Sequence, residues 1–117
     1  MSLEANKAIA AAAAKYAQSI KEGKGDYVKE LLADNAVIYG MMGGDMIATP
    51  AADFVAMVDS GPAAPPTYES HVDVVCAEET IAVVRVLESG LGDMAFTGYL
   101  LMLKVGDDWK AVAKVFA

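Results

Sequence analysis

The sequence contains few of the residues that build metal sites and disulfides. Among its 117 residues it has one cysteine, Cys76, and one histidine, His71. A single cysteine cannot form an internal disulfide, and one histidine with scattered carboxylates gives no recognisable set of metal ligands. We therefore expect no metal site. We also expect no cofactor, because no glycine-rich phosphate loop joins a strand to a helix.

Positive charge is also scarce. Nine Lys and Arg residues stand against 16 Asp and Glu, which gives a net charge of −7. Such a surface repels phosphate backbones and anionic membranes, so neither nucleic acid nor a membrane is an expected partner. No uninterrupted apolar run reaches the ~18 residues that a membrane span needs. The length predicts one soluble domain over residues 1–117, expected in the cytoplasm, whose residues 1–3 resemble an expression remnant.

Two helices are predicted in the first part of the chain. Apolar residues at helical spacing, among them Ile9 and Tyr16, predict an amphipathic first helix. Gly23 is expected to end this helix, and Asp26 is expected to cap a second, shorter one.

A hairpin and a third helix are predicted next. Strands over 36–39 and 45–48 flank a glycine pair, which is a strong turn signal. Thr49 is expected to cap the third helix, with Pro50 as its first residue. The apolar face of that helix is predicted to contain Phe54, Met57 and Val58.

From residue 67 onward the pattern changes to strands. Four are predicted, over 68–75, 81–87, 94–104 and 109–116, separated by short acidic or Gly/Asp turns. Helices segregated from strands indicate the α+β class, here a curved mixed or antiparallel sheet wrapped around three helices from the first half. A strongly twisted sheet can curl around the helices and leave a conical pocket at its open end.

Six short segments of the chain form a familiar set, at residues 33–40, 43–44, 60–63, 96–99, 109–110 and 114–116. Together they resemble the putative lumazine-binding group of the nuclear transport factor 2-like, or cystatin-like, superfamily, and the resemblance covers nearly the whole chain. It implies the α+β cone and a homodimer formed through the outer face of the sheet. The group often has Asp where this chain has Gly98 and Asn where it has Ala113. Two polar pocket positions of the group are thus small and apolar here.

The superfamily includes ketosteroid isomerase, scytalone dehydratase and polyketide cyclases, as well as proteins that serve only for binding or dimerisation, so fold does not fix function. Three functions stay open. The first is a small-molecule-binding domain for an unknown small apolar ligand. The second is an enzyme that isomerises, dehydrates or cyclises a ketone-like substrate. The third is a non-catalytic homodimeric interaction module whose pocket is filled by side chains. For the first function, the predicted pocket lining is Tyr16, Tyr39, Met42, Phe54, Met57, Phe96 and Trp109.

For the enzyme, Tyr16 and Asp45 are the candidate catalytic residues. Tyr16 is similar in position to the oxyanion-stabilising tyrosine of ketosteroid isomerase, and a buried phenol can donate to a developing enolate. The position that resembles the isomerase's base is Gly40, so Asp45, just past the glycine pair, is the nearest alternative carboxylate. The simpler alternatives are a core tyrosine and a solvated hairpin aspartate.

Arg85 is the polar residue that we expect first to bind a ligand, since a guanidinium can hold a carboxylate or phosphate through two hydrogen bonds. Its alternative role is a dimer-face or edge pairing with Glu69, Asp73 or Glu88. His71 is the default acid or base at neutral pH. However, Val72 and Val74 belong to the core-facing set of their strand, so His71 is expected on the opposite face, toward solvent or a partner subunit.

Overall fold

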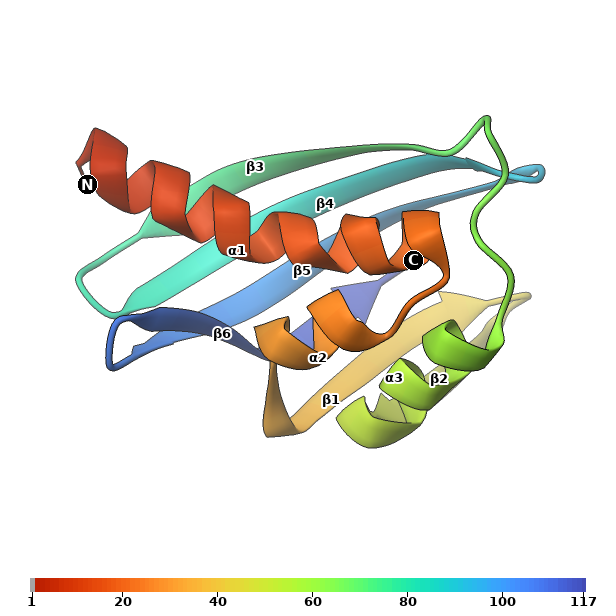
Figure 1. Ribbon diagram of the computed structural model, residues 1–117, viewed down its shortest axis with the longest axis horizontal. Helices are drawn as coiled ribbons and strands as arrows, with labels where there is room; N and C mark the ends of the chain where they lie inside the picture. The colour runs from red at the N-terminus through yellow and green to blue at the C-terminus, as the bar shows by residue number, and fades with distance from the viewer. Residues whose placement is uncertain (1) are drawn as a thin grey trace.

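The computed structural model describes residues 2–117, which form three helices and one six-stranded sheet. The helices are α1 (Leu3–Glu22), α2 (Asp26–Leu31) and α3 (Ala51–Ser60). The strands are β1 (Leu32–Met42), β2 (Asp45–Pro50), β3 (Glu69–Ala77), β4 (Ile81–Leu91), β5 (Met94–Val105) and β6 (Asp108–Phe116). The strand order is β2-β1-β6-β5-β4-β3, and the only parallel pair in this described part is β1 with β6. Figure 1 shows the helices gathered on one face of the curved sheet, which confirms the predicted α+β class.

A specific residue caps each end of helix α1. The Ser2 Oγ accepts a hydrogen bond from the Ala5 N–H at 3.0 Å, so a residue within the segment that resembles an expression remnant caps the helix. Gly23 ends the helix with a φ of 67°, in the left-handed region that favours glycine. No helix within residues 2–117 is long and apolar enough to cross a membrane.

The predicted cap of α2 is wrong by one residue. Asp26 is the first helical residue and Gly25 occupies the cap position, without a side-chain cap of its own. The Gly25 N–H instead donates to Asp59 Oδ1 at 3.0 Å, which ties the start of α2 to the end of α3. The carboxylate that helps to anchor this start comes from a distant part of the chain, which a local pattern does not reveal.

The predicted start of α3 is also wrong. Thr49 and Pro50 belong to the end of β2, where they pair with Ile38 and Val37 of β1, and Pro50 is the residue before the helix. The sheet therefore extends over the two residues that local propensity assigns to the helix.

Met57 does not belong to the buried face of α3, since it is 58% exposed. That face consists of Ala51, Phe54 and Val58.

The strand register gives the sheet an inner face toward the helices and an outer face away from them. Across β1, β6, β5 and β4, one inner row contains Ile38, Lys114, Leu100 and Val84, all of them buried. The neighbouring outer row contains Tyr39, Val115, Tyr99, Arg85 and Asp73. Val72 and Val74 pack against the core, which confirms that His71 lies on the outer face beside Asp73.

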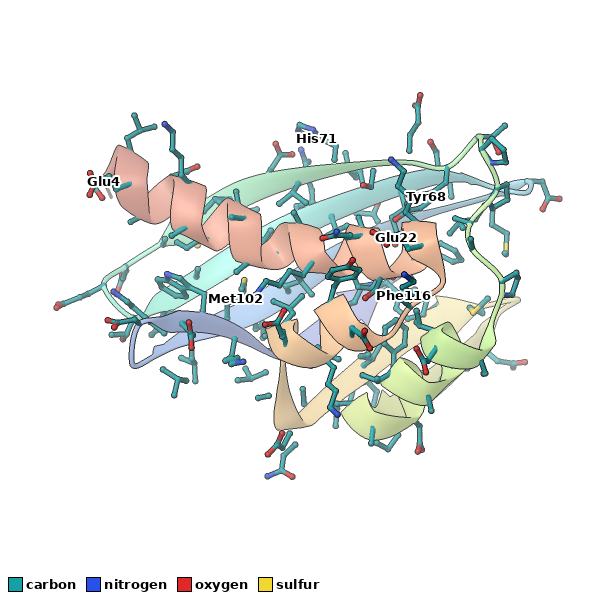
Figure 2. The ribbon with its side chains drawn as sticks, viewed as in Figure 1. Glu4, Glu22, Tyr68, His71, Met102 and Phe116 are labelled. Carbon is teal, nitrogen blue, oxygen red and sulfur yellow. The ribbon has the colours of Figure 1, made fainter. Side chains whose placement is uncertain are left out.

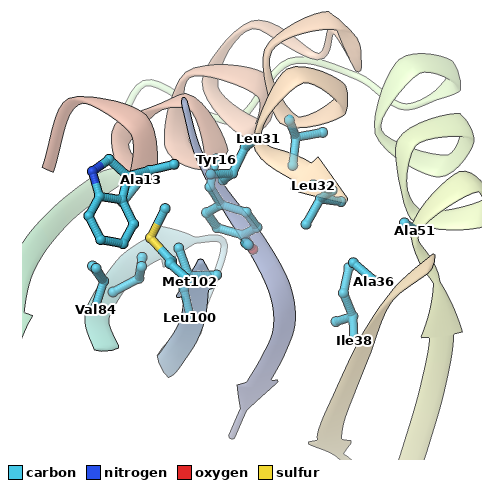
Figure 3. Close-up of a cluster of buried hydrophobic side chains, with 14 of the residues drawn as sticks. Ala13, Tyr16, Leu31, Leu32, Ala36, Ile38, Ala51, Val84, Leu100 and Met102 are labelled. Atoms are coloured by element: carbon cyan, nitrogen blue, oxygen red, sulfur yellow. The ribbon is translucent and has the colours of Figure 1, made fainter. Parts of the chain in front are cut away.

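The hydrophobic core lies between the helices and the inner face (Figure 3). Its largest fully buried side chains include Ile9 and Leu31 from the helices and Leu100 and Met102 from β5. Ser19 is a polar residue within this core and is completely buried. Its Oγ accepts a hydrogen bond from the Val28 N–H at 2.8 Å, which fastens α2 to α1.

Candidate functional site

A pair of opposite charges is buried on the inner face of the sheet. Lys114 on β6 and Glu88 on β4 each have side chains that are only 3% exposed, and Lys114 Nζ lies 3.9 Å from Glu88 Oε1. The other ion pairs within residues 2–117 join side chains that are at least 35% exposed. Taking two charges out of water costs several kcal/mol for each ion. A buried pair of this kind is a candidate functional site rather than a simple source of stability.

Gly98 makes room for the lysine side chain. In the register of β5, Lys114 is opposite Leu100 and Glu88 is opposite Phe96, with Gly98 midway between them. A Cβ atom at residue 98 would lie 3.1 Å from Lys114 Cε. The lysine side chain therefore passes over Gly98 on its way to the carboxylate. The absence of a side chain at this position leaves room for the lysine to lie there.

Aromatic rings surround the amino group. Lys114 Nζ lies 3.6 Å from the ring centroid of Tyr16 and 5.1 Å from that of Phe116. Tyr16, from α1, stacks on Phe54 of α3 with 6.0 Å between the ring centroids (Figure 3 shows Tyr16 between α1 and the sheet). Burial lowers the pKa of Lys114 to about 8, although the charge of Glu88 acts in the opposite direction. A sizeable share of this amine is therefore uncharged in mildly alkaline solution.

Two phenols complete the site. Tyr68, the residue before β3, donates its hydroxyl to Glu88 Oε2 at 2.7 Å. Burial, followed by the hydrogen bond and charge of Glu88, raises the pKa of Tyr68 far above its ordinary value. Burial and then Glu88 also raise the pKa of Tyr16. Both phenols therefore stay protonated and can donate hydrogen bonds. We call Tyr16, Tyr68, Glu88 and Lys114 the interior polar cluster.

A groove between α1 and β3 borders this cluster at Tyr68. It has a volume of about 680 Å³ and is lined by Ala14, Ala17, Gln18, Lys21, Glu22, Tyr68, Glu69 and Ser70. Tyr68 thus forms part of the groove wall and is hydrogen-bonded to buried Glu88. Figure 2 shows Tyr68 beside the C-terminal part of α1, near Glu22.

Some of the predicted lining residues lie in the interior. Tyr16 belongs to the interior polar cluster, and Phe54 stacks on it. Phe96 is half-buried and meets Phe116 edge-on, with 5.5 Å between the ring centroids. Trp109 is buried, but it lines a separate hollow of about 270 Å³ beside the N-terminal half of α1. The structure thus places three of the predicted aromatic residues in or next to one contiguous group, and Trp109 apart from it.

Other predicted residues are not brought to this group. Tyr39 and Arg85 lie in the same row of the outer face, and Met42 and Met57 are exposed. Asp45 is exposed at the start of β2, opposite Met42, whereas Tyr16 is buried. The structure therefore does not bring the predicted acid–base pair together.

Arg85 has the alternative role given by the sequence. Its Nε and Nη2 both donate to Asp73 Oδ2, the former at 3.2 Å, and His71 Nε2 lies 2.8 Å from Asp73 Oδ1. The guanidinium, more than the imidazole, lowers the pKa of Asp73. These three side chains form a polar network on the outer face of the sheet.

At Gly40, which resembles the isomerase base position, a Cβ atom would come within 2.2 Å of the Phe116 ring. The ring of Phe116 fills the space into which a side chain at residue 40 would project. Within residues 2–117, no group of three or more His, Cys, Asp and Glu side chains could hold a metal ion.

The residues Lys114, Glu88 and Tyr68 were not predicted from the sequence as members of one site. A signal for Glu88 was present, because Ala82, Val84 and Val86 alternate as core-facing residues and Glu88 continues that series. Tyr68 gave no comparable signal, since it lies in an irregular segment before β3.

The three helices packed on a curved six-stranded sheet define a nuclear transport factor 2-like protein. Solved structures share this fold. An NTF2-like protein of unknown function from Shewanella baltica matches with a TM-score of 0.89 and 19% identity over 100% of this chain and 95% of that one. A ketosteroid isomerase-like protein from Erwinia carotovora atroseptica matches with a TM-score of 0.71 and 17% identity over 98% and 96%. These likenesses establish the fold alone.

The family is established by sequence. Residues 4–117 match the model of the putative lumazine-binding family, and the chain belongs to this family. A related protein named aldolase FrzH, from a Cladobotryum species, is 26% identical over 110 residues, which are 93% of this chain and 87% of that protein.

Proposed function

We propose that this chain binds a small, mostly apolar carbonyl compound at the interior polar cluster and moves a proton at the carbon next to the carbonyl. The observation that carries the proposal is the buried Lys114–Glu88 pair, with one phenol bonded to the carboxylate and another stacked under the amino group. A positioned carboxylate is a general base for such a proton. Phenols that stay protonated are donors to the oxygen on which negative charge develops.

The surroundings of the cluster support an apolar ligand. The aromatic rings of Phe54 and Phe116 flank it, and charged groups other than Glu88 and Lys114 are absent from the described core. The similarity to a protein named aldolase also supports the reaction class, since an aldol reaction begins with loss of a proton next to a carbonyl. In this proposal Glu88 takes the place that the sequence analysis gave to Asp45, while Tyr16 keeps its expected role as a hydrogen-bond donor.

The proposal is tested by hydrogen–deuterium exchange of small ketones and aldehydes. Each carbonyl compound is incubated with the protein in D₂O, and exchange at the neighbouring carbon is followed by NMR. We expect acceleration by the wild type and a loss of about 100-fold in Glu88→Gln, which is at the lower end of what a general base contributes. Glu79→Gln is the matched control, because Glu79 is exposed in the turn between β3 and β4, away from the groove.

A second variant distinguishes a loss of exchange activity from a loss of the fold. Tyr68→Phe removes only the hydroxyl that bonds Glu88, and its residue is half-buried, so the fold is expected to persist. Exchange should be slower in this variant while its far-UV circular dichroism is unchanged. Equal exchange rates with and without the protein across the panel would reject the proposal, as would full activity in a folded Glu88→Gln protein.

The outer face of the sheet favours a second candidate function, the homodimeric interaction module. Large apolar side chains on β1, β5 and β6 are exposed there, at Val37, Tyr39, Tyr99, Leu101, Leu103 and Val115. A contiguous apolar surface on a monomer is typical of an interface. We propose that two copies of this chain pair through this face, which leaves the helix-covered inner face free for a ligand.

The dimer is tested by sedimentation equilibrium. Leu101→Lys places a charge on the outer face and should give a monomer, whereas Met46→Lys, at a residue 71% exposed on the edge strand β2, should not. A wild-type protein that stays monomeric at about 100 μM would contradict the pairing, since stable interfaces have dissociation constants well below that concentration.

A further inference from the structure

Lys114 differs from every other lysine of the chain. It is the only one that is buried within residues 2–117, while the rest are half-buried or exposed. The function proposed above gives its amino group no chemical role beyond a place beside Glu88. A primary amine that is desolvated in an apolar interior has the environment of lysines that react with carbonyl groups.

We propose that the Lys114 amine condenses with the carbonyl carbon of an aldehyde or ketone ligand to form an imine. This inference rests on the proposed function for its ligand class and adds a covalent step to it. It also limits the size of the ligand, because the carbonyl compound must be small enough to reach Nζ between the Tyr16 and Phe116 rings.

The groups that face the amine from each packed element fit this step. Helix α1 provides the face of Tyr16, and β6 itself provides Phe116. Strand β5 provides Leu100, which is opposite Lys114, and Gly98, over which the lysine side chain passes. Strand β4 provides Glu88, whose carboxylate also accepts the Tyr68 hydroxyl. Thus a single group that can accept and return a proton stands next to the nitrogen, among otherwise apolar or phenolic surfaces.

The step is balanced with these groups and one proton from solvent water. The lone pair of the uncharged amine attacks the carbonyl carbon, a C–N bond forms and the C=O π bond breaks. The oxygen takes a proton from solvent water, whose hydroxide returns to the buffer, to give a carbinolamine. Glu88 accepts the proton that the nitrogen loses. The C–O bond then breaks, the hydroxyl leaves as water with a proton from Glu88, and the protonated imine remains. The iminium withdraws electrons from the neighbouring carbon, so Glu88 can remove its proton more readily than from the free ketone.

The amine must be uncharged to react. Burial brings the pKa of Lys114 to about 8, whereas an ordinary lysine has a value of 10.5. At pH 8 about half of Lys114 is therefore uncharged, against about 0.3% of an exposed lysine. The uncharged fraction is higher by a factor on the order of 100.

Reductive trapping tests the inference. The wild-type protein is incubated at pH 8 with butanal or cyclohexanone and sodium cyanoborohydride, and the modified residue is located by peptide mass spectrometry. We expect one alkyl group at Lys114, formed on the order of 100-fold faster than at exposed Lys104. Lys114→Met should abolish this fast modification, and Lys104→Met should leave it unchanged.

The outcomes separate this inference from the proposed function. Modification that is spread over exposed lysines, with none at Lys114 in the folded wild type, overturns the imine even if Lys114→Met does not fold. If Glu88-dependent exchange at the carbon next to the carbonyl persists without trapping, the imine is wrong and the proposed function stands. If neither exchange nor trapping occurs, both are wrong.

Discussion

The buried amino group of Lys114 should make the fold more stable as the pH rises from about 7 to about 9.5. In the unfolded chain this lysine has its ordinary pKa of 10.5, and in the folded protein burial lowers the pKa to about 8. The folded state therefore holds fewer protons than the unfolded state between these values. Stability increases with pH wherever the unfolded state binds more protons. The penalty for burying the ammonium is complete below pH 8 and is relieved as the pH rises toward 10.5.

The magnitude follows from integrating the proton difference for this one group. Between pH 7 and pH 9.5 the free energy of unfolding should increase by about 2 kcal/mol, with a slope of about 1.2 kcal/mol per pH unit at the upper end. Tyr16 and Tyr68 act in the opposite direction, because their pKa values are raised in the fold. The stability that these two tyrosines contribute is present below pH 10.0, the pKa of an unfolded tyrosine, and is lost above it. The pH range from 7 to 9.5 therefore ends before this loss.

The assay is urea unfolding at pH 7, 8 and 9.5, followed by the fluorescence of Trp109, which is 8% exposed in the fold. Lys114→Met is the comparison protein, because it keeps the length of the side chain and removes the titrating group. The wild type should gain about 2 kcal/mol relative to this variant across the window. Two parallel curves would refute the conclusion that the amine is buried with a lowered pKa.

Three substitutions test the packing around the site. Ser19→Ala should lower the free energy of unfolding by about 1–3 kcal/mol, because the buried Val28 N–H would lose its acceptor; an unchanged urea midpoint would contradict this bond. Gly40→Ala should cost at least about 1–3 kcal/mol, since its methyl group would overlap the Phe116 ring. A neutral effect would show that the ring does not cover Gly40. Met57→Gln should change stability by less than about 0.5 kcal/mol, as expected at a residue 58% exposed; a larger loss would place Met57 in the core.

Much of the fold follows from short-range patterns in the sequence. The strands β4, β5 and β6 alternate between buried and exposed positions over most of their length, and glycine turns separate them. The first helix has an apolar stripe that includes Ile9 and Tyr16 and ends at Gly23. Such signals depend only on neighbours in the chain, which is why they predict the class and order of the elements.

Lys114 could not be placed by the same alternation. Leu101 pairs with Ala113 and Met102 with Ala111, so β6 has one extra residue, Val112, at this point. The bulge reverses the alternation. With Ala111 on the core side, a regular strand would direct Lys114 outward, whereas the structure buries it. A single extra residue thus moves the charged group into the interior. No local residue pattern predicts this bulge.

Arg85 and Asp45 show a different limit. Both have the side-chain chemistry of a binding or catalytic residue, and sequence reasoning ranked them for that chemistry. Their faces are set by register, which directs Arg85 to Asp73 on the outer surface and leaves Asp45 exposed in the hairpin. Chemical type alone therefore selects residues that the fold places away from the interior polar cluster.

The interior polar cluster lowers the stability that this fold could have. A buried ion pair replaced by apolar residues of similar volume often leaves a protein equally stable or up to about 4 kcal/mol more stable. We therefore expect the double variant Lys114→Met with Glu88→Leu, made in a Tyr16→Phe protein, to unfold at the same or a higher urea concentration than Tyr16→Phe alone. This background is used because the buried Tyr16 hydroxyl would also lose Glu88. The Tyr68 hydroxyl borders the groove and can bond to water there. The same variant should lose exchange and trapping completely, so stability and activity move in opposite directions. A loss of more than about 1 kcal/mol would instead show that Lys114 and Glu88 are present to hold the sheet together.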